Sequence, residues 1–328
     1  MELIILGSSG AIPVKERNLP AIALKSKTHP EIILFDCGED TQRQFIEAGL
    51  KFNKPLKIFI SHFHGDHIIG LPGLLFRFSL IDRTAPLMIF GPRNLFFYLY
   101  FHRITLGLHA GYPLTIVEID HENQELIHFE GLDSEEPIKK EKIVNNIVFE
   151  TKWYMMKYAL VDHSVPTYAY AFLEKHRLGK FNPEKAKELG IPQGRIWKTL
   201  HEGNQVEYDG KIIDPVKEGI VGPKRPGRKI TYSGDTMPCQ SLIELGKDSD
   251  LLIHEATYAK NLAEVAHEKK HSTSIDAANS AIKMNAKQLL LTHISSRYQD
   301  DAQLLLAEAK EIYPNTLLAR DLLRIAID

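Results

Sequence analysis

Residues 61–67 read Ser61-His62-Phe63-His64-Gly65-Asp66-His67, an H-x-H-x-D-H pattern that directly follows the β-type run Leu56–Ile60. Three imidazoles and a carboxylate this close together would be costly to bury without polar partners or a compensating charge. Nitrogen and oxygen donors of this kind suit Zn²⁺. The intervening glycine frees the backbone, so that the first two histidines can face one ion and the last two donors a second. The pattern therefore predicts a metal centre on a loop at the end of a strand.

One such motif supplies only part of two coordination spheres, so further ligands are expected at later strand ends. His163, Asp235 and His293 each stand just after or near a β-type run. Taken singly, each could equally be structural, and Asp235 could be a turn or cap residue. Together with the first motif they complete two sites, and Asp235 would bridge the two ions, the arrangement of two-metal phosphodiester hydrolysis. Asp36, at another strand end, is a candidate for orienting a ligand imidazole.

The composition is that of a globular protein without a membrane partner. The chain has 328 residues, 40 Lys and Arg against 42 Asp and Glu, and 44% hydrophobic residues. Its longest apolar runs are far shorter than a membrane span. The first run, Glu2–Leu6, predicts a strand and not a signal peptide. Only two cysteines occur, Cys37 and Cys239, which excludes a disulfide framework and favours a cytoplasmic location.

Strand and helix patterns alternate along the chain, which predicts an α/β layered domain. Charge is uneven between them. Residues 118–142 carry nine acidic against three basic residues with little periodicity, and we expect a solvated insertion there. Residues 174–201 carry seven basic against three acidic residues, and residues 217–229 five against one. Each basic segment alone could be a solvated face, but two of them in a near-neutral chain favour contact with a polyanion.

Several longer motifs carry a family resemblance. They include Phe35-Asp36-Cys37-Gly38-Glu39, His254-Glu255-Ala256-Thr257-Tyr258, His271-Ser272-Thr273-Ser274 and Thr292-His293-Ile294-Ser295-Ser296-Arg297-Tyr298. With these motifs the sequence resembles the metallo-β-lactamase fold and, within it, the tRNA 3′-processing endoribonucleases of the ribonuclease Z family. The resemblance implies a four-layer αββα fold over residues 1–328, with a basic substrate-binding arm inserted at residues 173–203. It also implies removal of the 3′ trailer from precursor tRNA in a homodimer with two Zn²⁺ per subunit.

The resemblance also implies roles for individual residues. His62, His64 and His163 would hold one zinc, Asp66, His67 and His293 the other, and Asp235 both. Asp66 would also accept a proton from the attacking water, His271 would protonate the leaving ribose oxygen, and Glu255 would orient His271. The candidates for contact with the RNA are Arg17, Arg297, Lys175, Arg177, Lys180, Arg195 and Lys198. At the tip of the arm, Arg195 and Lys198 depart from the proline and glycine that the family usually has.

Two other functions remain open on the residues alone. A dinuclear zinc hydrolase of the same fold could act on small phosphodiesters, thioesters or lactams, but such substrates need no basic arm. A non-catalytic RNA-binding member would have lost ligands, whereas all seven expected ligands and His271 are present.

Overall fold

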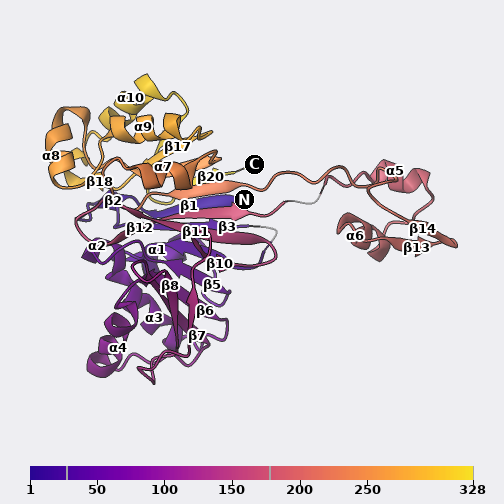
Figure 1. The fold of residues 1–328 in the computed structure, drawn as a ribbon, viewed down its shortest axis with the longest axis horizontal. Coiled ribbons are helices and arrows are strands. Elements are labelled where there is room, and N and C mark those ends of the chain that lie inside the picture. Colours follow the sequence, from indigo (N-terminus) through magenta and orange to yellow (C-terminus); the bar gives the residue numbers. More distant parts are fainter. Residues whose placement is uncertain (27–28, 177–178, 328) are drawn as a thin grey trace. The chain divides into compact units, whose positions relative to one another are not determined.

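Two β-sheets packed face to face form the centre of the computed structural model, which describes residues 1–26, 29–176 and 179–327 (Figure 1). The first sheet has the order β20-β1-β3-β4-β5-β6-β7-β8-β9, and β4 to β7 run parallel in it. Its strands are β1 (Glu2–Gly7), β3 (Ala21–Lys25), β4 (Ile32–Phe35), β5 (Leu56–Phe59), β6 (Leu87–Pro92), β7 (Leu114–Asp120), β8 (Glu125–Glu130), β9 (Lys139–Lys142) and β20 (Arg324–Ala326).

The second sheet has the order β10-β11-β12-β15-β16-β17-β19, and its last four strands run parallel. The strands are β10 (Ile147–Glu150), β11 (Tyr154–Val161), β12 (Thr167–Glu174), β15 (Lys229–Tyr232), β16 (Leu251–Glu255), β17 (Leu289–Thr292) and β19 (Thr316–Leu318). Buried aromatic rings join the sheets. Phe35 of β4 lies 5.5 Å from Tyr232 of β15, and Phe59 of β5 lies 5.4 Å from Tyr170 of β12, between ring centroids.

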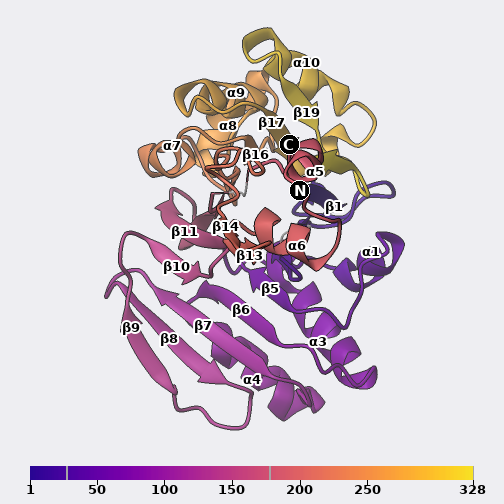
Figure 2. The same cartoon turned by 90° about the vertical axis from the view of Figure 1, so that its right-hand side faces the viewer.

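Helices cover the outer face of each sheet (Figures 1 and 2). Over the first sheet lie α1 (Thr41–Glu47), α3 (Gly70–Leu80) and α4 (Leu95–Leu106). Over the second lie α7 (Gln240–Gly246), α9 (Ser274–Lys283) and α10 (Gln303–Ile312), with α8 (Ala263–Glu268) preceding α9. The order of layers is therefore helix, sheet, sheet, helix. No helix in the described ranges combines the length and the apolar character needed to cross a bilayer.

A short parallel pair brings the N-terminal loop to the end of β17. Strand β2 (Ser9–Gly10) pairs with β18 (Ile294–Ser295), and Ile294 donates its backbone N–H to the Ser8 carbonyl. Gly10 lies directly against the His293 ring, because a Cβ on this glycine would come within 2.5 Å of the ring atoms Cε1 and Nδ1. Only glycine lets the backbone approach the histidine this closely.

Residues 152–154 and 173–228 form a second compact unit. It contains α5 (Pro183–Glu188), α6 (Arg195–His201) and the hairpin of β13 (Val206–Tyr208) and β14 (Lys211–Ile213). Its own small core comprises Ala186, Ile191, Leu200, Ile220 and Val221. The unit thus extends beyond residue 203, where the range inferred from the sequence ends, because residues near 220 complete its core.

The acidic segment 118–142 differs from the expected solvated insertion. Much of it forms β8 and β9, which add antiparallel strands to the edge of the first sheet. Glu118 and Asp120 are buried at the end of β7 and pair with Arg93, whose Nη1 lies 2.6 Å from Asp120 Oδ2. The high acidic content of the segment hid the alternation of its strands.

Candidate metal centre

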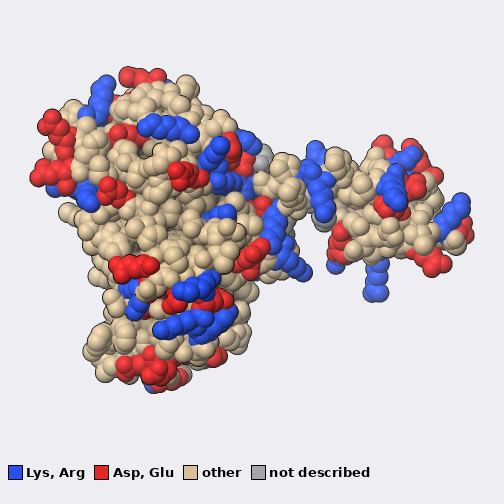
Figure 3. All heavy atoms as spheres, viewed as in Figure 1, with Lys and Arg blue, Asp and Glu red and all other residues tan. Residues whose placement is uncertain are grey.

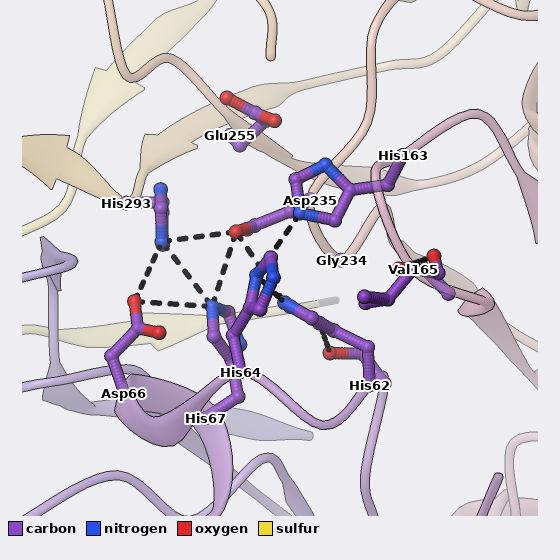
Figure 4. A network of polar contacts seen from close by, with 12 residues as sticks. His62, His64, Asp66, His67, His163, Val165, Gly234, Asp235, Glu255 and His293 are labelled. Carbon is purple, nitrogen blue, oxygen red and sulfur yellow. Dashed lines mark hydrogen bonds and ion pairs between the residues drawn. The ribbon is translucent and has the colours of Figure 1, made fainter. Parts of the chain in front are cut away.

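Seven histidine and aspartate side chains meet at the ends of strands from both sheets (Figure 4). His62 and His64 follow β5, and Asp66 and His67 lie on the short helix α2 (Gly65–Ile68). The other three follow strands of the second sheet: His163 after β11, Asp235 after β15 and His293 after β17. The structure thus brings together all seven side chains that the sequence offered as ligands.

The first group contains His62, His64, His163 and Asp235. His64 Nδ1 lies 3.0 Å from His62 Nε2 and 3.2 Å from His163 Nε2. Asp235 Oδ2 lies 3.7 Å from His62 Nε2. Donors about 2.0–2.1 Å from a tetrahedral Zn²⁺ would lie about 3.4 Å apart, so these spacings suit one shared ion.

The second group contains Asp66, His67 and His293. His293 Nε2 lies 3.2 Å from both His67 Nε2 and Asp66 Oδ2. The same Oδ2 of Asp235 lies 3.3 Å from His67 Nε2 and 3.2 Å from His293 Nε2. One carboxylate oxygen therefore lies close to donors of both groups, as a bridging ligand requires.

Hydrogen bonds on the outer sides of the rings fix four tautomers with a free Nε2 lone pair facing inward. His67 Nδ1–H donates to Asp36 Oδ2 at 2.7 Å, and His163 Nδ1–H donates to the Lys270 carbonyl at 2.8 Å. The Ser61 hydroxyl donates to Asp36, so its oxygen accepts from His62 Nδ1–H at 2.9 Å. These bonds leave the inward nitrogens as acceptors, which is the form that binds a metal.

The same logic holds for His293. The Thr257 hydroxyl donates to Glu255 Oε2 at 2.6 Å, and its oxygen accepts from His293 Nδ1–H at 2.8 Å. His293 also has a left-handed backbone with φ of 56°, a costly conformation for a residue with a side chain. The pairing of β2 with β18 holds it in place.

The carboxylates of the cluster favour positive charge beside them. Burial lowers the pKa of His67, but the carboxylates of Asp235 and Asp36 outweigh burial and hold that pKa well above its usual value. Asp235 is buried, and its Oδ1 has no hydrogen-bond partner in the described part of the chain. A cation between these groups would supply the missing charge and use the free oxygen. The donor set thus fits metal ions.

His271 lies beside this cluster, in the turn between α8 and α9. Its ring stacks on His293 at 5.5 Å between centroids, and its Nδ1 lies 2.9 Å from Glu255 Oε1. Burial lowers the pKa of His271, but the charge of Glu255 and the hydrogen bond to it raise that pKa to about 9. Glu255 therefore favours the protonated form of His271 and holds the ring from its Nδ1 side. The other ring nitrogen, Nε2, is left to donate to a substrate.

The remaining candidates, proposed for contact with the RNA, supply no donor to either group within the described ranges. Arg17 donates through Nη1 to Ser8 Oγ and the Ala319 carbonyl, so its guanidinium already holds parts of the fold together. Arg297 is exposed and lies over the Tyr258 ring. Four other candidates belong to the second unit, where Lys175 is half-buried and Lys180, Arg195 and Lys198 are exposed. Arg177 lies outside the described residues. On the surface of this unit, Lys and Arg alternate with Asp and Glu (Figure 3).

Several residues around the site were given no role by the sequence, even where they stand inside a quoted motif. Lys270, Thr257 and Ser61 act through a backbone carbonyl or a hydroxyl, which many residues could supply. Tyr232, whose hydroxyl donates to Asp36 Oδ2 at 2.6 Å, reads in the sequence as a buried strand residue. A polar residue next to a candidate ligand was the only available hint.

Solved structures define the class of protein. The chain matches human tRNase Z, short form, with a TM-score of 0.66 and 26% identity, covering 100% of both chains. It also matches the metallo-β-lactamase fold protein YhfI from Bacillus subtilis with a TM-score of 0.61 at 16% identity, covering 99% of each chain. This is a metallo-β-lactamase-fold protein, and the fold class predicted from the sequence is confirmed.

Relatives found by sequence identify the family within this fold. Proteins named ribonuclease Z from Methanosarcina acetivorans and Nitrosopumilus maritimus are 36% and 38% identical over 100% of this chain and 98% and 100% of their own lengths. The chain belongs to the ribonuclease Z family, as its motifs predicted. Residues 1–169 also belong to a family described as anti-Pycsar protein Apyc1.

Proposed function

We propose that this protein is a zinc-dependent endoribonuclease that removes the 3′ trailer from precursor tRNA. The observation that carries the proposal is the two-group donor cluster with its shared Asp235 oxygen, beside His271 held by Glu255, in a chain related over its full length to proteins named ribonuclease Z. His62, His64 and His163 would hold one zinc, Asp66, His67 and His293 the other, and Asp235 both.

The chain's own residues handle the protons of the reaction. Two bound ions would lower the pKa of an attacking water and stabilise charge on the phosphate. Asp66, held by the Ala11 N–H at 2.8 Å, is placed to accept the proton that this water loses. Water attacks phosphorus, the bond from phosphorus to the ribose O3′ breaks, and His271 Nε2–H protonates that oxygen. The products are a 3′-hydroxyl on the tRNA and a 5′-phosphate on the trailer.

The basic residues of the second unit favour a large, negatively charged substrate. Its exposed Lys180, Arg195 and Lys198 would contact phosphates of the tRNA body, where contacts fix position without reading sequence. A hydrolase for small phosphodiesters has no use for such a unit. We assign residues 173–203 and their continuation to residue 228 to the substrate-binding arm.

A homodimer accords with an apolar stripe on α4. Phe97, Phe101 and Ile104 stand one helical turn apart on one face, and they are 40%, 59% and 60% exposed. Contiguous apolar surface of this kind marks an interface in many proteins.

The cysteines accord with a cytoplasmic location. Both are free thiols, and a reducing cytoplasm, where precursor tRNA is processed, would keep them in that state.

The test is to incubate the zinc-loaded protein with 3′-extended precursor tRNA and to sequence the new ends. We expect one cut near the end of the acceptor stem that leaves a 3′-hydroxyl. The Asp235→Asn variant serves as the negative control. Hydrolysis of bis(p-nitrophenyl) phosphate without cleavage of precursor tRNA would instead indicate a hydrolase of small phosphodiesters.

A further inference from the structure

The turn that carries His271 has an unusual residue at its centre. Lys270 has φ of 56°, in the left-handed region. Its N–H donates to the His267 carbonyl at 3.0 Å, and the N–H of His271 donates to the Ala266 carbonyl at 2.8 Å. This pair of bonds is the Schellman motif that ends a helix, and the position of Lys270 in it usually belongs to glycine. A lysine there costs stability that a glycine would not.

Lys270 also makes two bonds to the loop that carries His163. Its Nζ lies 2.8 Å from Asp162 Oδ1, and its carbonyl accepts from His163 Nδ1–H at 2.8 Å. Asp162 immediately precedes His163, and Lys270 immediately precedes His271. A single residue thus joins the loop of a metal-binding candidate (labelled His163 in Figure 4) to the turn of the candidate general acid.

We infer that Lys270 and Asp162 form a positioning pair that sets the distance between His163 and His271. The inference rests on the proposed function, in which the two histidines act on the same phosphodiester. Neither Lys270 nor Asp162 touches the reacting atoms in this scheme. The Lys270 carbonyl fixes the ring and tautomer of His163, and the ion pair holds that carbonyl at the Nδ1 edge of the ring.

The backbone geometry allows the side chain to be tested apart from the fold. Lys270→Gly removes the ammonium group while favouring the left-handed conformation, so the turn keeps its hydrogen bonds. Lys270→Arg keeps a cation that can reach Asp162. Lys269→Ala is the matched control, because it removes the same charge one residue earlier and the described chain gives this side chain no ionic partner.

We expect Lys270→Gly to melt at the same temperature as the wild type or higher, yet to cleave precursor tRNA more slowly. The expected loss in kcat is about tenfold with KM unchanged, less than the roughly hundredfold cost of a 1 Å misplacement. A chelator should also remove zinc faster from this variant, because the ion that His163 would hold is bound less firmly. Lys270→Arg should restore most of the cleavage rate and most of the resistance to the chelator. Lys269→Ala should match the wild type within about twofold in kcat and in the rate of zinc release.

A second set of variants tests the pair itself. Asp162→Asn should reproduce the losses of Lys270→Gly, and the double variant should be no worse than either single one. Additive losses, an equal loss in Lys269→Ala, or a Lys270→Gly enzyme with normal kcat and normal zinc release would overturn the inference. Failure of the wild-type enzyme to cut precursor tRNA would instead contradict the proposed function, and the zinc-release and melting measurements would still test the pair.

Discussion

Replacing Glu255 with glutamine should slow the cleavage of precursor tRNA mainly at neutral and alkaline pH. The carboxylate of Glu255, 2.9 Å from His271 Nδ1, is the main cause that raises the pKa of His271 to about 9 against the effect of burial, with a smaller contribution from the charge of Asp235. A neutral amide removes that charge, so the pKa of His271 falls back toward about 6.5 or below. His271 then loses its proton as the pH rises through neutrality.

The size of the effect follows from the two pKa values. At pH 7.5 a group with a pKa of about 9 is about 97% protonated, and one with a pKa of about 6.5 is about 9% protonated. If protonated His271 is the general acid, kcat at pH 7.5 should fall about tenfold, whereas at pH 6 the loss should be less than about twofold. The alkaline limb of the profile of kcat against pH should therefore move to lower pH.

The assay is single-turnover cleavage of precursor tRNA from pH 5.5 to 9.5, with zinc content and melting temperature measured alongside. Stability matters because Glu255 also accepts hydrogen bonds from the backbone N–H groups of Thr236 and Ser272. A glutamine amide facing such donors leaves buried groups unpaired, at about 1–3 kcal/mol. His271→Ala is the companion variant, and its kcat should fall roughly 10²–10⁴-fold with zinc retained.

Three results would refute this reasoning. One is an equal loss of rate at every pH in Glu255→Gln, which would mean that Glu255 acts only through structure. Another is an unchanged alkaline limb in His271→Ala, because the limb would then belong to another group. Loss with a nitrophenyl ester equal to the loss with tRNA would also exclude a general acid, since nitrophenolate leaves without a proton.

Three further predictions test the metal centre and the arm. Asp235→Ala should lower the content of both zinc ions, measured by elemental analysis, because one carboxylate oxygen faces both groups; two full equivalents would remove it from the bridging role. Gly10→Ala should displace the His293 ring and weaken zinc binding about 10–100-fold in a chelator competition, whereas Gly111→Ala, where a Cβ would make only ordinary contact with the His109 side chain at 3.8 Å, tests for a general effect of the substitution. Replacing residues 175–227 by a short Gly/Ser linker is geometrically simple, because the Glu174 N–H donates to the Arg228 carbonyl at 2.8 Å. This variant should keep hydrolysis of bis(p-nitrophenyl) phosphate, bind precursor tRNA more weakly and show a flatter salt dependence, whereas unchanged tRNA affinity would show that the basic residues do not contact the substrate.

The layered fold was predictable because its strands are short apolar runs that end in polar residues. Glu2–Leu6 and Leu56–Ile60 were expected as strands, and both lie in the first sheet as β1 and β5. Residues 118–142 were interpreted wrongly, because charged side chains dominate that segment. Its pairing in β8 and β9 and the burial of Glu118 against Arg93 depend on a neighbouring strand that local sequence does not reveal.

The histidine motif after β5, in contrast, could be recognised from local sequence alone. Closely spaced imidazoles and a carboxylate are so costly to bury that their presence itself requires an explanation. His163 and His293 offer no such local signal, since each is a single histidine at a strand end. Their convergence depends on two sheets that meet and on the left-handed backbone of His293, which no propensity predicts.

The hydrogen-bond partners on the outer sides of the histidine rings could not be predicted from the sequence. His62 and His67 turn their lone pairs inward because they donate to Ser61 and Asp36, and the same carboxylate of Asp36 serves both through the serine hydroxyl. Such partners are chemically ordinary, and any hydroxyl or carbonyl in the right place would do. Metal affinity commonly falls about 10–100-fold when they are lost, so the residues hardest to recognise in the sequence matter almost as much as the ligands themselves. What distinguishes them is position, and position is a property of the folded chain.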